Sequence, residues 1–246
     1  MTILNIQAHP DDADCHCGGT TAKYAQGGAS VYYLICTKGN RGTYDRQLDL
    51  ERLAAIRREE TRAAARVLGV KNVYFLDGED GFLYPDTEFR GRIMRVIRQV
   101  KPDLVMTLDP FKPYEVHPDH RTVGMLASEA TVFAGFPHFY PVHLEEGLAP
   151  HFVKELHYYR TDSPNLREDI TAYIDTKLEA CYAHRSQIEM AGVQKKAVTG
   201  DPRPVEELGR ETFRELALAR EIHIESFRKF RVRAGHLDFS TEDKEP

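Results

Sequence analysis

Short apolar runs alternate with longer amphipathic stretches over most of the chain. The runs are rich in β-branched and aromatic residues, as at 31–37, which is typical of buried strands. The amphipathic stretches repeat apolar residues at helical spacing, and the one at 50–68 ends at Gly69, a frequent helix terminator. The predicted strands are 3–8, 31–37, 72–76, 103–108 and 153–159, and the predicted helices are 18–26, 50–68, 88–100, 122–133, 166–190 and 205–230.

Strands that alternate with helices of this length form βαβ units, and such units build a parallel sheet with helices on both faces. The pattern therefore predicts an α/β fold with a Rossmann-like, mostly parallel sheet. We expect one domain over 1–234 and a polar, frayed C-terminal tail over 235–246. In sheets of this kind the active site forms at the carboxyl ends of the strands, which is where the unusual residues of this chain fall.

Composition narrows the class of protein. Of the 246 residues 41% are hydrophobic, which is enough for a core and excludes a disordered chain. A net charge of −5 argues against a protein that binds nucleic acid through broad basic surfaces. No apolar run approaches the ~20 residues of a membrane span, the N-terminus lacks a basic, signal-like region, and 4 cysteines are too few for a disulfide scaffold. We expect a cytoplasmic protein without nucleic-acid or membrane partners.

Two polar clusters follow predicted strands. A His-Pro-Asp-Asp sequence at 9–12 comes directly after the first strand, and a His-Pro-Asp-His-Arg sequence at 117–121 comes shortly after the fourth. Either could be an ordinary turn in which Asp12 or Asp119 caps the next helix. However, the ends of strands one and four can be neighbours in a parallel sheet, so the two clusters can share one crevice. Imidazole nitrogens and carboxylate oxygens are ligands of catalytic zinc, so the joint occurrence favours a metal site.

The two clusters also resemble the signature of the LmbE-like, or PIG-L, family of zinc-dependent N-acetylglucosaminyl deacetylases. The resemblance spans about residues 3 to 190 and keeps the order of the family's motifs. One departure is Ala13, where the family often has a glutamate. Further matches are Gly18-Gly19-Thr20, Thr37-x-Gly39-x-x-Gly42-Thr43, Arg57-x-x-Glu60, Leu68-Gly69-Val70 and Lys177-x-x-Ala180-x-x-x-His184-x-Ser186-Gln187.

The resemblance implies one divalent metal ion per chain, usually Zn²⁺, and a role for each matching residue. His9, Asp12 and His120 match the metal ligands, and Asp11 matches the general base that deprotonates the attacking water. Arg41 stands where the family commonly has an acidic residue, so a cation at the mouth of the site could favour an anionic substrate. The other implied site residues are His117, for the oxyanion or the leaving amine, Asp119, which orients His117, Arg57, which contacts substrate, and His184, at the rim of the site.

The implied reaction agrees with the chemistry of these groups. An amide is a poor electrophile, so its hydrolysis needs an activated water, a stabilised oxyanion and a protonated leaving amine. The predicted function is therefore a metal-dependent hydrolase that removes the acetyl group from an N-acetylglucosamine-type substrate. The alternative is a metal-dependent hydratase on the same fold that acts on an unsaturated carboxylic acid. Both acidic residues of the 9–12 cluster are present, which favours amide hydrolysis.

Other interpretations fit the sequence less well. A nucleotide-binding module would need a glycine-rich phosphate loop after the first strand, and a non-haem iron oxygenase would suit an all-β pattern better. Cys15 and Cys17 lack the spacing of a metal-binding pair, so we expect them to be small buried residues. The aromatic stretch 133–152 could line the sugar-binding cleft or form a subunit contact. We expect a homo-oligomer, a trimer or a hexamer.

Overall fold

The computed structural model describes residues 1–218, 223–233 and 235–238. Within these ranges an eight-stranded sheet has the order β3-β2-β1-β4-β5-β7-β6, and β8 pairs with β7. The strands are β1 (Thr2–Gln7), β2 (Ser30–Thr37), β3 (Asn72–Gly78), β4 (Leu104–Leu108), β5 (Glu155–Tyr159), β6 (Leu166–Asp169), β7 (Ile224–Arg233) and β8 (His236–Asp238). The helices are α1 (Asp12–Gln26), α2 (Leu50–Leu68), α3 (Thr87–Val100), α4 (Pro118–Phe133), α5 (Val142–Glu145), α6 (Ile174–Tyr182), α7 (Arg185–Thr199) and α8 (Val205–Ala217), with a 3₁₀ turn at Thr171–Tyr173.

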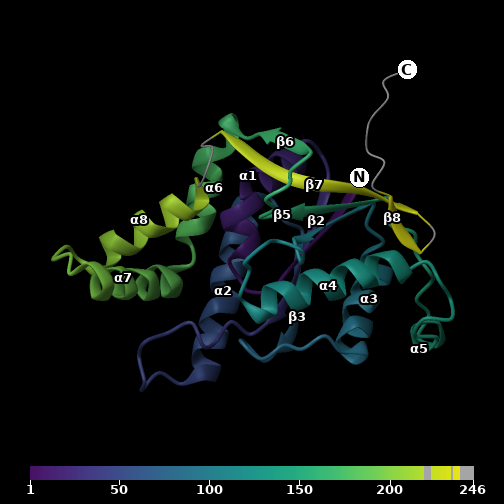
Figure 1. Ribbon diagram of the computed structural model, residues 1–246, viewed down its shortest axis with the longest axis horizontal. Helices are drawn as coiled ribbons and strands as arrows, with labels where there is room; N and C mark the ends of the chain where they lie inside the picture. The colour runs from purple at the N-terminus through teal and green to yellow at the C-terminus, as the bar shows by residue number, and fades with distance from the viewer. Residues whose placement is uncertain (219–222, 234, 239–246) are drawn as a thin grey trace.

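The first five strands are parallel. β1 pairs with β2 on one side and with β4 on the other, and β3 and β5 extend the sheet outward. β7 runs antiparallel to both β5 and β6. The helices α1, α2 and α6 pack together, and α3 packs with α4 on the opposite face of the sheet (Figure 1). The predicted α/β fold, with a mostly parallel sheet between helices, is confirmed.

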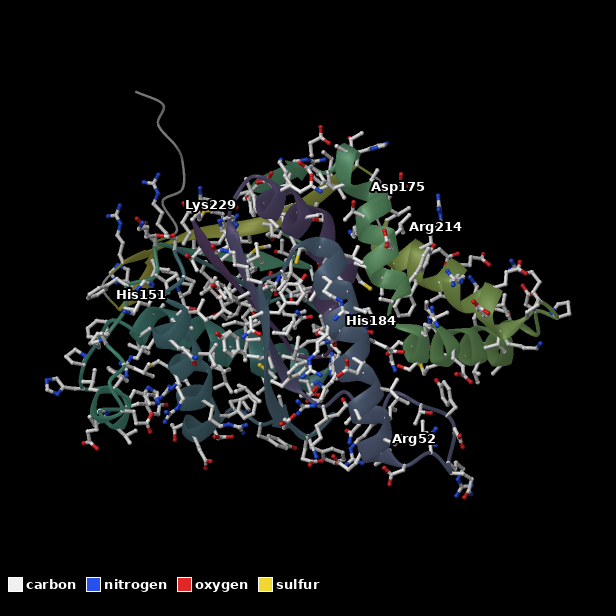
Figure 2. All side chains as sticks on the ribbon, turned by 180° about the vertical axis from the view of Figure 1, so that it is seen from behind. Arg52, His151, Asp175, His184, Arg214 and Lys229 are labelled. Carbon is white, nitrogen blue, oxygen red and sulfur yellow. The ribbon has the colours of Figure 1, made fainter. Side chains whose placement is uncertain are left out.

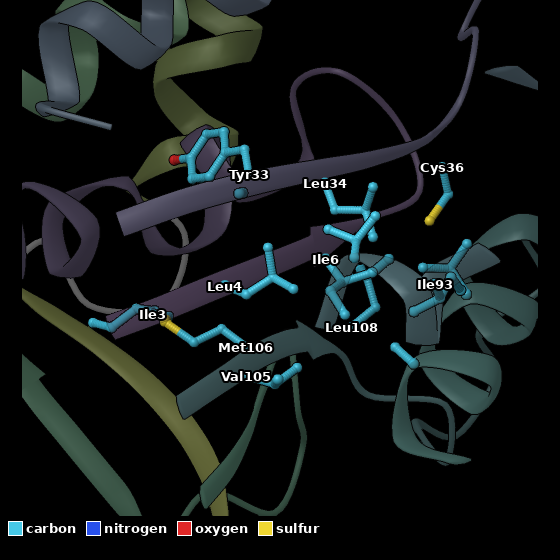
Figure 3. Close-up of a cluster of buried hydrophobic side chains, with 14 of the residues drawn as sticks. Ile3, Leu4, Ile6, Tyr33, Leu34, Cys36, Ile93, Val105, Met106 and Leu108 are labelled. Atoms are coloured by element: carbon cyan, nitrogen blue, oxygen red, sulfur yellow. The ribbon is translucent and has the colours of Figure 1, made fainter. Parts of the chain in front are cut away.

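The core lies where β1 and β4 run through the middle of the sheet. Side chains from β1, β2, β4 and α3 pack together there (Figure 3). Ile3, Leu4 and Ile6 are all at most 1% exposed, so β1 is buried on both faces. Its polar residues Asn5 and Gln7 are buried as well, so the strand has no solvent-facing polar side of the kind seen in a half-exposed strand.

The C-terminal third departs from the predicted helices. The second half of the expected helix 205–230 is strand β7, and the start of the expected helix 166–190 is strand β6. Phe227 and Phe230 are three residues apart, which imitates helical spacing, but tertiary pairing with β5 and β6 decides their conformation. Within the expected tail, 236–238 form β8, and 239–246 lie outside the described residues.

The helix α1 is broken at Cys17, whose φ of −145° and ψ of 23° are not helical. The break frees the backbone N–H groups of Gly19 and Thr20, which donate to the carboxylate of Glu225 on β7 at 3.0 and 2.7 Å. Nζ of Lys177 on α6 lies 2.7 Å from the same carboxylate, and both side chains are 3% exposed. The predicted helix start at 18 therefore corresponds to the second segment of α1. A buried ion pair joins this segment to β7 and α6.

The aromatic stretch 133–152 is ordered through Arg98, which is fully buried. Its guanidinium donates to the carbonyl oxygens of Ala134, Phe136 and Tyr140 at 3.1, 2.8 and 3.2 Å. The stretch follows the C-terminal end of α4, whereas the polar cluster at 117–121 stands at the N-terminal end of that helix. The suggestion that it lines the same cleft as this cluster is therefore wrong.

We expect the Lys177–Glu225 pair to be a main support of the fold. Glu225→Gln leaves a buried lysine charge without its partner, and breaking such pairs costs about 3–5 kcal/mol of the free energy of unfolding. Glu206→Gln removes an exposed partner of Arg210 and should change stability by less than about 0.5 kcal/mol. Urea unfolding of the two variants and the wild type measures the difference. Equal stabilities for the two variants would contradict the role of the pair.

Candidate active site

The two polar clusters meet at the carboxyl end of the central strands. β1 and β4 are in parallel register from Ile3↔Leu104 to Ile6↔Thr107, so the segments that follow them emerge side by side. A cavity of about 460 Å³ opens at this edge. The side chains of both clusters that line it are His9, Asp11, Asp12, His117 and His120.

Three of these side chains present ligand-type atoms to one point. Nε2 of His120 lies 3.2 Å from Nδ1 of His9 and 3.3 Å from Oδ1 of Asp12. Nδ1 of His9 lies 3.4 Å from Oδ2 of Asp12. In a tetrahedral zinc site with ligand bonds of about 2.0–2.1 Å, neighbouring ligand atoms are about 3.3–3.4 Å apart. His9 and His120 face different oxygens of Asp12. Taken pair by pair, the separations are those of zinc ligands, and the three residues are the set that the resemblance implied.

Among the described residues, His9 belongs to two groups of three possible ligands, and neither group contains Asp12. One consists of His9, His117 and His120, and the other of His9, Asp80 and Asp119. The second group uses the opposite ring nitrogen, because Nε2 of His9 lies 3.1 Å from Asp119 and 3.3 Å from Asp80. A ring that donates Nε2–H to these carboxylates keeps its Nδ1 lone pair free for the metal site. We therefore interpret Asp80 and Asp119 as partners that orient His9.

The position of Asp119 corrects one expectation. We expected its carboxylate to orient His117, but it lies against His9 and accepts backbone N–H groups of Gly81 and Leu83 at 2.7 and 3.1 Å. The buried Nδ1 of His117 has no hydrogen-bond partner among the described residues. Asp119 also does not act as a helix cap, because α4 begins one residue earlier and its N-cap is His117.

The electrostatics of the cluster depend on this packing. Burial alone would lower the pKa of His9, but Asp12, Asp119 and Asp80 raise it well above its usual value. Burial would raise the pKa of Asp12, but His120 and His9 hold it well below its usual range. The pKa of His117, by contrast, is lowered by burial and by the nearby His9 and His120. His117 is therefore neutral at neutral pH and can donate one N–H.

Asp11 lines the same cavity but pairs with an arginine. Its Oδ1 lies 3.1 Å from Nη2 of Arg57, which is 3% exposed, while Asp11 itself is 21% exposed. Nη1 of Arg57 donates to the carbonyl oxygen of Gly39 at 2.5 Å. Gly39 has a φ of +60°, and an added Cβ would stand 2.5 Å from Nη1 of Arg57. Gly39, in the loop after β2, therefore fixes the position of Arg57, and Arg57 in turn fixes the carboxylate of Asp11.

The remaining expected site residues fall in different places. Arg41 lies at the rim, with a 46% exposed side chain that stacks on Phe82 and pairs with Glu79. His184 (labelled in Figure 2) is not at the rim: it is fully buried, and its Nε2 lies 2.7 Å from Asp14. His184 is the N-cap residue of α7, and its ring lies against Asp14 of α1. The neighbouring Gln187 lines the cavity instead.

Sequence reasoning missed three charged residues of the site. Asp80 follows β3, Arg160 follows β5, and Glu115 precedes the 117–121 cluster. Asp80 and Arg160 line the cavity, and Glu115 contacts both Arg160 and His120. The same rule that drew attention to strands one and four, applied to the ends of strands three and five, would have found Asp80 and Arg160. No pattern in the sequence distinguishes Glu115 from other loop acids.

Comparison with known proteins agrees with this site. The family description PIG-L, GlcNAc-PI de-N-acetylase, matches residues 4–131, and the match contains both polar clusters. The chain belongs to the PIG-L family. It is 42% identical over 185 residues to diacetylchitobiose deacetylase of Thermococcus kodakarensis, which covers 75% of this chain and 69% of that protein. It is 29% identical to the probable N-acetyl-α-D-glucosaminyl L-malate deacetylase 2 of Bacillus anthracis, over 86% of this chain and 93% of the relative.

Solved structures of the PIG-L fold agree as well. N,N′-diacetylchitobiose deacetylase from Pyrococcus horikoshii, in complex with its inhibitor MPG, superposes with a TM-score of 0.80. The two chains are 36% identical, over 93% of this chain and 83% of that one. GalB, the 4-carboxy-2-hydroxymuconate hydratase of Pseudomonas putida, superposes with a TM-score of 0.69 at 23% identity over 93% and 95% of the two chains, which shows a shared fold alone. The predicted family is confirmed, and its named deacetylases are the better match to this PIG-L protein.

The described part of this PIG-L protein contains no helix that is both long enough and apolar enough to cross a bilayer. The four cysteines are free and buried, as expected for Cys15 and Cys17.

We expect Gly39→Ala to disturb the site more than a similar change elsewhere. Gly28 also has a positive φ, of +88°, but an added Cβ there meets nothing within 4 Å. Gly28→Ala should cost only the left-handed strain, about 1–2 kcal/mol of the free energy of unfolding. Gly39→Ala should cost about 1–3 kcal/mol more, because its Cβ must displace Arg57. Urea unfolding compares them, and equal losses would contradict the close packing of Arg57 on this loop.

Proposed function

We propose that this protein is a zinc-dependent deacetylase that hydrolyses the acetamido group of an N-acetylglucosamine-type sugar. The observation that carries the proposal is the trio of His9, Asp12 and His120: the two ring nitrogens are 3.2 Å apart, and each lies 3.3–3.4 Å from one of the two oxygens of Asp12. A fourth residue of the same cavity, Asp11, is a carboxylate that the trio does not use. Ligand atoms for one ion and a separate base are what metal-assisted amide hydrolysis needs.

We assign Asp11 as the general base that accepts the proton of the attacking water. A divalent ion in this site would polarise the acetyl carbonyl and lower the pKa of a water molecule to about 7. The pairing of Asp11 with Arg57 fixes its carboxylate at the cavity wall. Arg57 is itself held by Gly39, so the base is positioned by the loop after β2. As the water oxygen bonds to the carbonyl carbon, Asp11 accepts the proton.

His117 is placed to act on the other side of the amide. Its ring stacks on His120 with a centroid distance of 4.4 Å and meets the edge of His9 at 4.6 Å. Since burial and the two neighbouring rings keep it neutral, its N–H can donate to the carbonyl oxygen as that oxygen gains charge. The C–N bond then breaks, and the amine leaves with the proton that the water gave up.

The substrate class follows from the relatives and the cavity. The named relatives act on diacetylchitobiose and on an N-acetylglucosaminyl malate, so a 2-acetamido sugar is the shared element. Arg57 and Gln187 line the cavity and can bind sugar hydroxyl groups, and the exposed Arg41 at the rim adds a positive charge. We propose a small N-acetylated sugar conjugate as substrate and keep the expectation of a cytoplasmic location.

We expect Asp11→Asn and Asp12→Asn to fail in different ways. Asp11→Asn removes the base but no ligand, so zinc should stay bound while acetate release from N,N′-diacetylchitobiose falls about 10²–10⁴-fold. Asp12→Asn removes a ligand, so zinc affinity should fall and excess zinc should restore part of the activity. Acetate release and metal content, measured on the same samples, separate the two effects.

The control is Asp175→Asn, an equal change of charge on the exposed side of α6 (Figure 2). It should keep both zinc and activity. Near-normal turnover of a zinc-loaded Asp11→Asn enzyme would show that Asp11 is not the base. A wild-type protein that binds no divalent ion would remove the metal from the proposal altogether.

We also keep the expectation that the protein forms a trimer or a hexamer. Val142 and Phe152 in the aromatic stretch are 46% and 70% exposed, which leaves apolar surface for a subunit contact. Light scattering at micromolar concentration should give three or six times the chain mass of 28.1 kDa. A mass equal to one chain would contradict the expectation.

A further inference from the structure

Nδ1 of His120 has two neighbours of opposite charge. Nη1 of Arg160 lies 2.8 Å from Nδ1, and Oε2 of Glu115 lies 3.4 Å from it. Arg160 and Glu115 also pair with each other, at 3.1 Å. Glu115 is 7% exposed, and its other oxygen accepts the backbone N–H of His117 at 3.1 Å. An ion pair is thus packed directly behind one of the three residues that the metal site would use.

The chemistry of an imidazole decides which neighbour matters. A neutral ring has one N–H and one lone pair, and a guanidinium can only donate. Nε2 of His120 faces His9 and Asp12 at 3.2 and 3.3 Å, so this is the nitrogen that would bind the ion. Its Nδ1 must then carry the proton and must donate it. Of the two neighbours, only the carboxylate of Glu115 can accept, so Nη1 of Arg160, a donor 2.8 Å from Nδ1, has to give way when Nδ1 carries the proton.

His9 shows the same arrangement in the opposite orientation. Its Nδ1 faces the site, and its Nε2 lies 3.1 Å from the carboxylate of Asp119. Each of the two ring ligands thus has one nitrogen on the site and the other beside a buried carboxylate. A carboxylate behind a ligand histidine fixes its tautomer and ring orientation and makes the ligand nitrogen more basic.

We propose that Glu115 is the positioning residue of His120. It accepts Nδ1–H and thereby directs the Nε2 lone pair toward the metal site, while Arg160 holds the Glu115 carboxylate in place. Arg160 follows β5 with a φ of +62°, a conformation that is uncommon outside glycine. This backbone turn directs a guanidinium from the neighbouring strand toward the loop that precedes α4. The inference rests on the proposed function in that it requires a divalent ion at His9, Asp12 and His120.

Three variants separate positioning from charge balance. Glu115→Met removes the acceptor, Arg160→Met removes the donor, and the double variant replaces the pair by two apolar side chains, a change that proteins often tolerate. Zinc affinity is measured by competition with a chromophoric chelator. We expect Glu115→Met to bind zinc about 10–100-fold more weakly, and Arg160→Met to lose less than about threefold. The double variant should remain as weak as Glu115→Met.

The double variant gives the decisive result. If Glu115 serves only to neutralise Arg160, removing both side chains restores wild-type zinc affinity, and the inference is overturned. Unchanged affinity of Glu115→Met overturns it as well. Thermal melting without metal checks that the three variants fold, so that a loss of zinc is not a loss of structure.

A second measurement shows which nitrogen of His120 carries the proton. In the zinc-loaded wild type, ¹⁵N NMR should show an Nδ1-protonated His120 with a slowly exchanging proton, which is lost in Glu115→Met and kept in Arg160→Met. A zinc-bound His120 protonated at Nε2 would overturn the inference and leave the proposed deacetylase intact. A wild-type protein without zinc affinity would instead overturn the metal part of the proposed function, and this inference with it.

Discussion

The hydrogen-bonded pairing of β1 with β4 brings together two segments that are 110 residues apart in the chain, as the contact of His9 with Asp119 shows. Both strands are central and buried, so their register is set by the core and cannot slip without exposing apolar side chains. The segments that follow the strands therefore leave the sheet side by side. The contacts of His120 with His9 and Asp12 depend on that register.

Burying the cluster that results costs free energy. Several imidazoles and carboxylates lie together with little exposure, and uncompensated charges of this kind are strongly unfavourable in a protein interior. The structure compensates by pairing: Asp119 and Asp80 lie against His9, Arg57 against Asp11, and Arg160 against Glu115. The Lys177–Glu225 pair has a different task, because it joins a broken helix to a late strand. The ion pairs of the cluster thus position the side chains of the site, whereas the Lys177–Glu225 pair stabilises the packing of the fold.

The parts that could be predicted are those with a strong local cause. The strand and helix periods, the glycine that ends α2 and the two polar clusters were recognisable without coordinates. The joint placement of the clusters followed from a general rule on parallel sheets. The late strand β7 was taken for a helix, since the spacing of Phe227 and Phe230 fits a helical face as well as a strand paired on both sides. His184 was expected at the rim, but it is fully buried and lies against Asp14 of α1.

The sequence by itself determined the family, the fold class and the identities of the ligand-type residues, because these are properties of short segments and of their order. The tertiary structure alone decided which atom faces which. Whether Asp119 lies against His117 or His9 depends on the direction of the first turn of α4, and whether Glu115 reaches His120 depends on the guanidinium of Arg160, which follows β5. Such contacts join residues from separate elements. Only the packing of those elements sets whether two side chains lie within hydrogen-bond distance or a few ångströms apart.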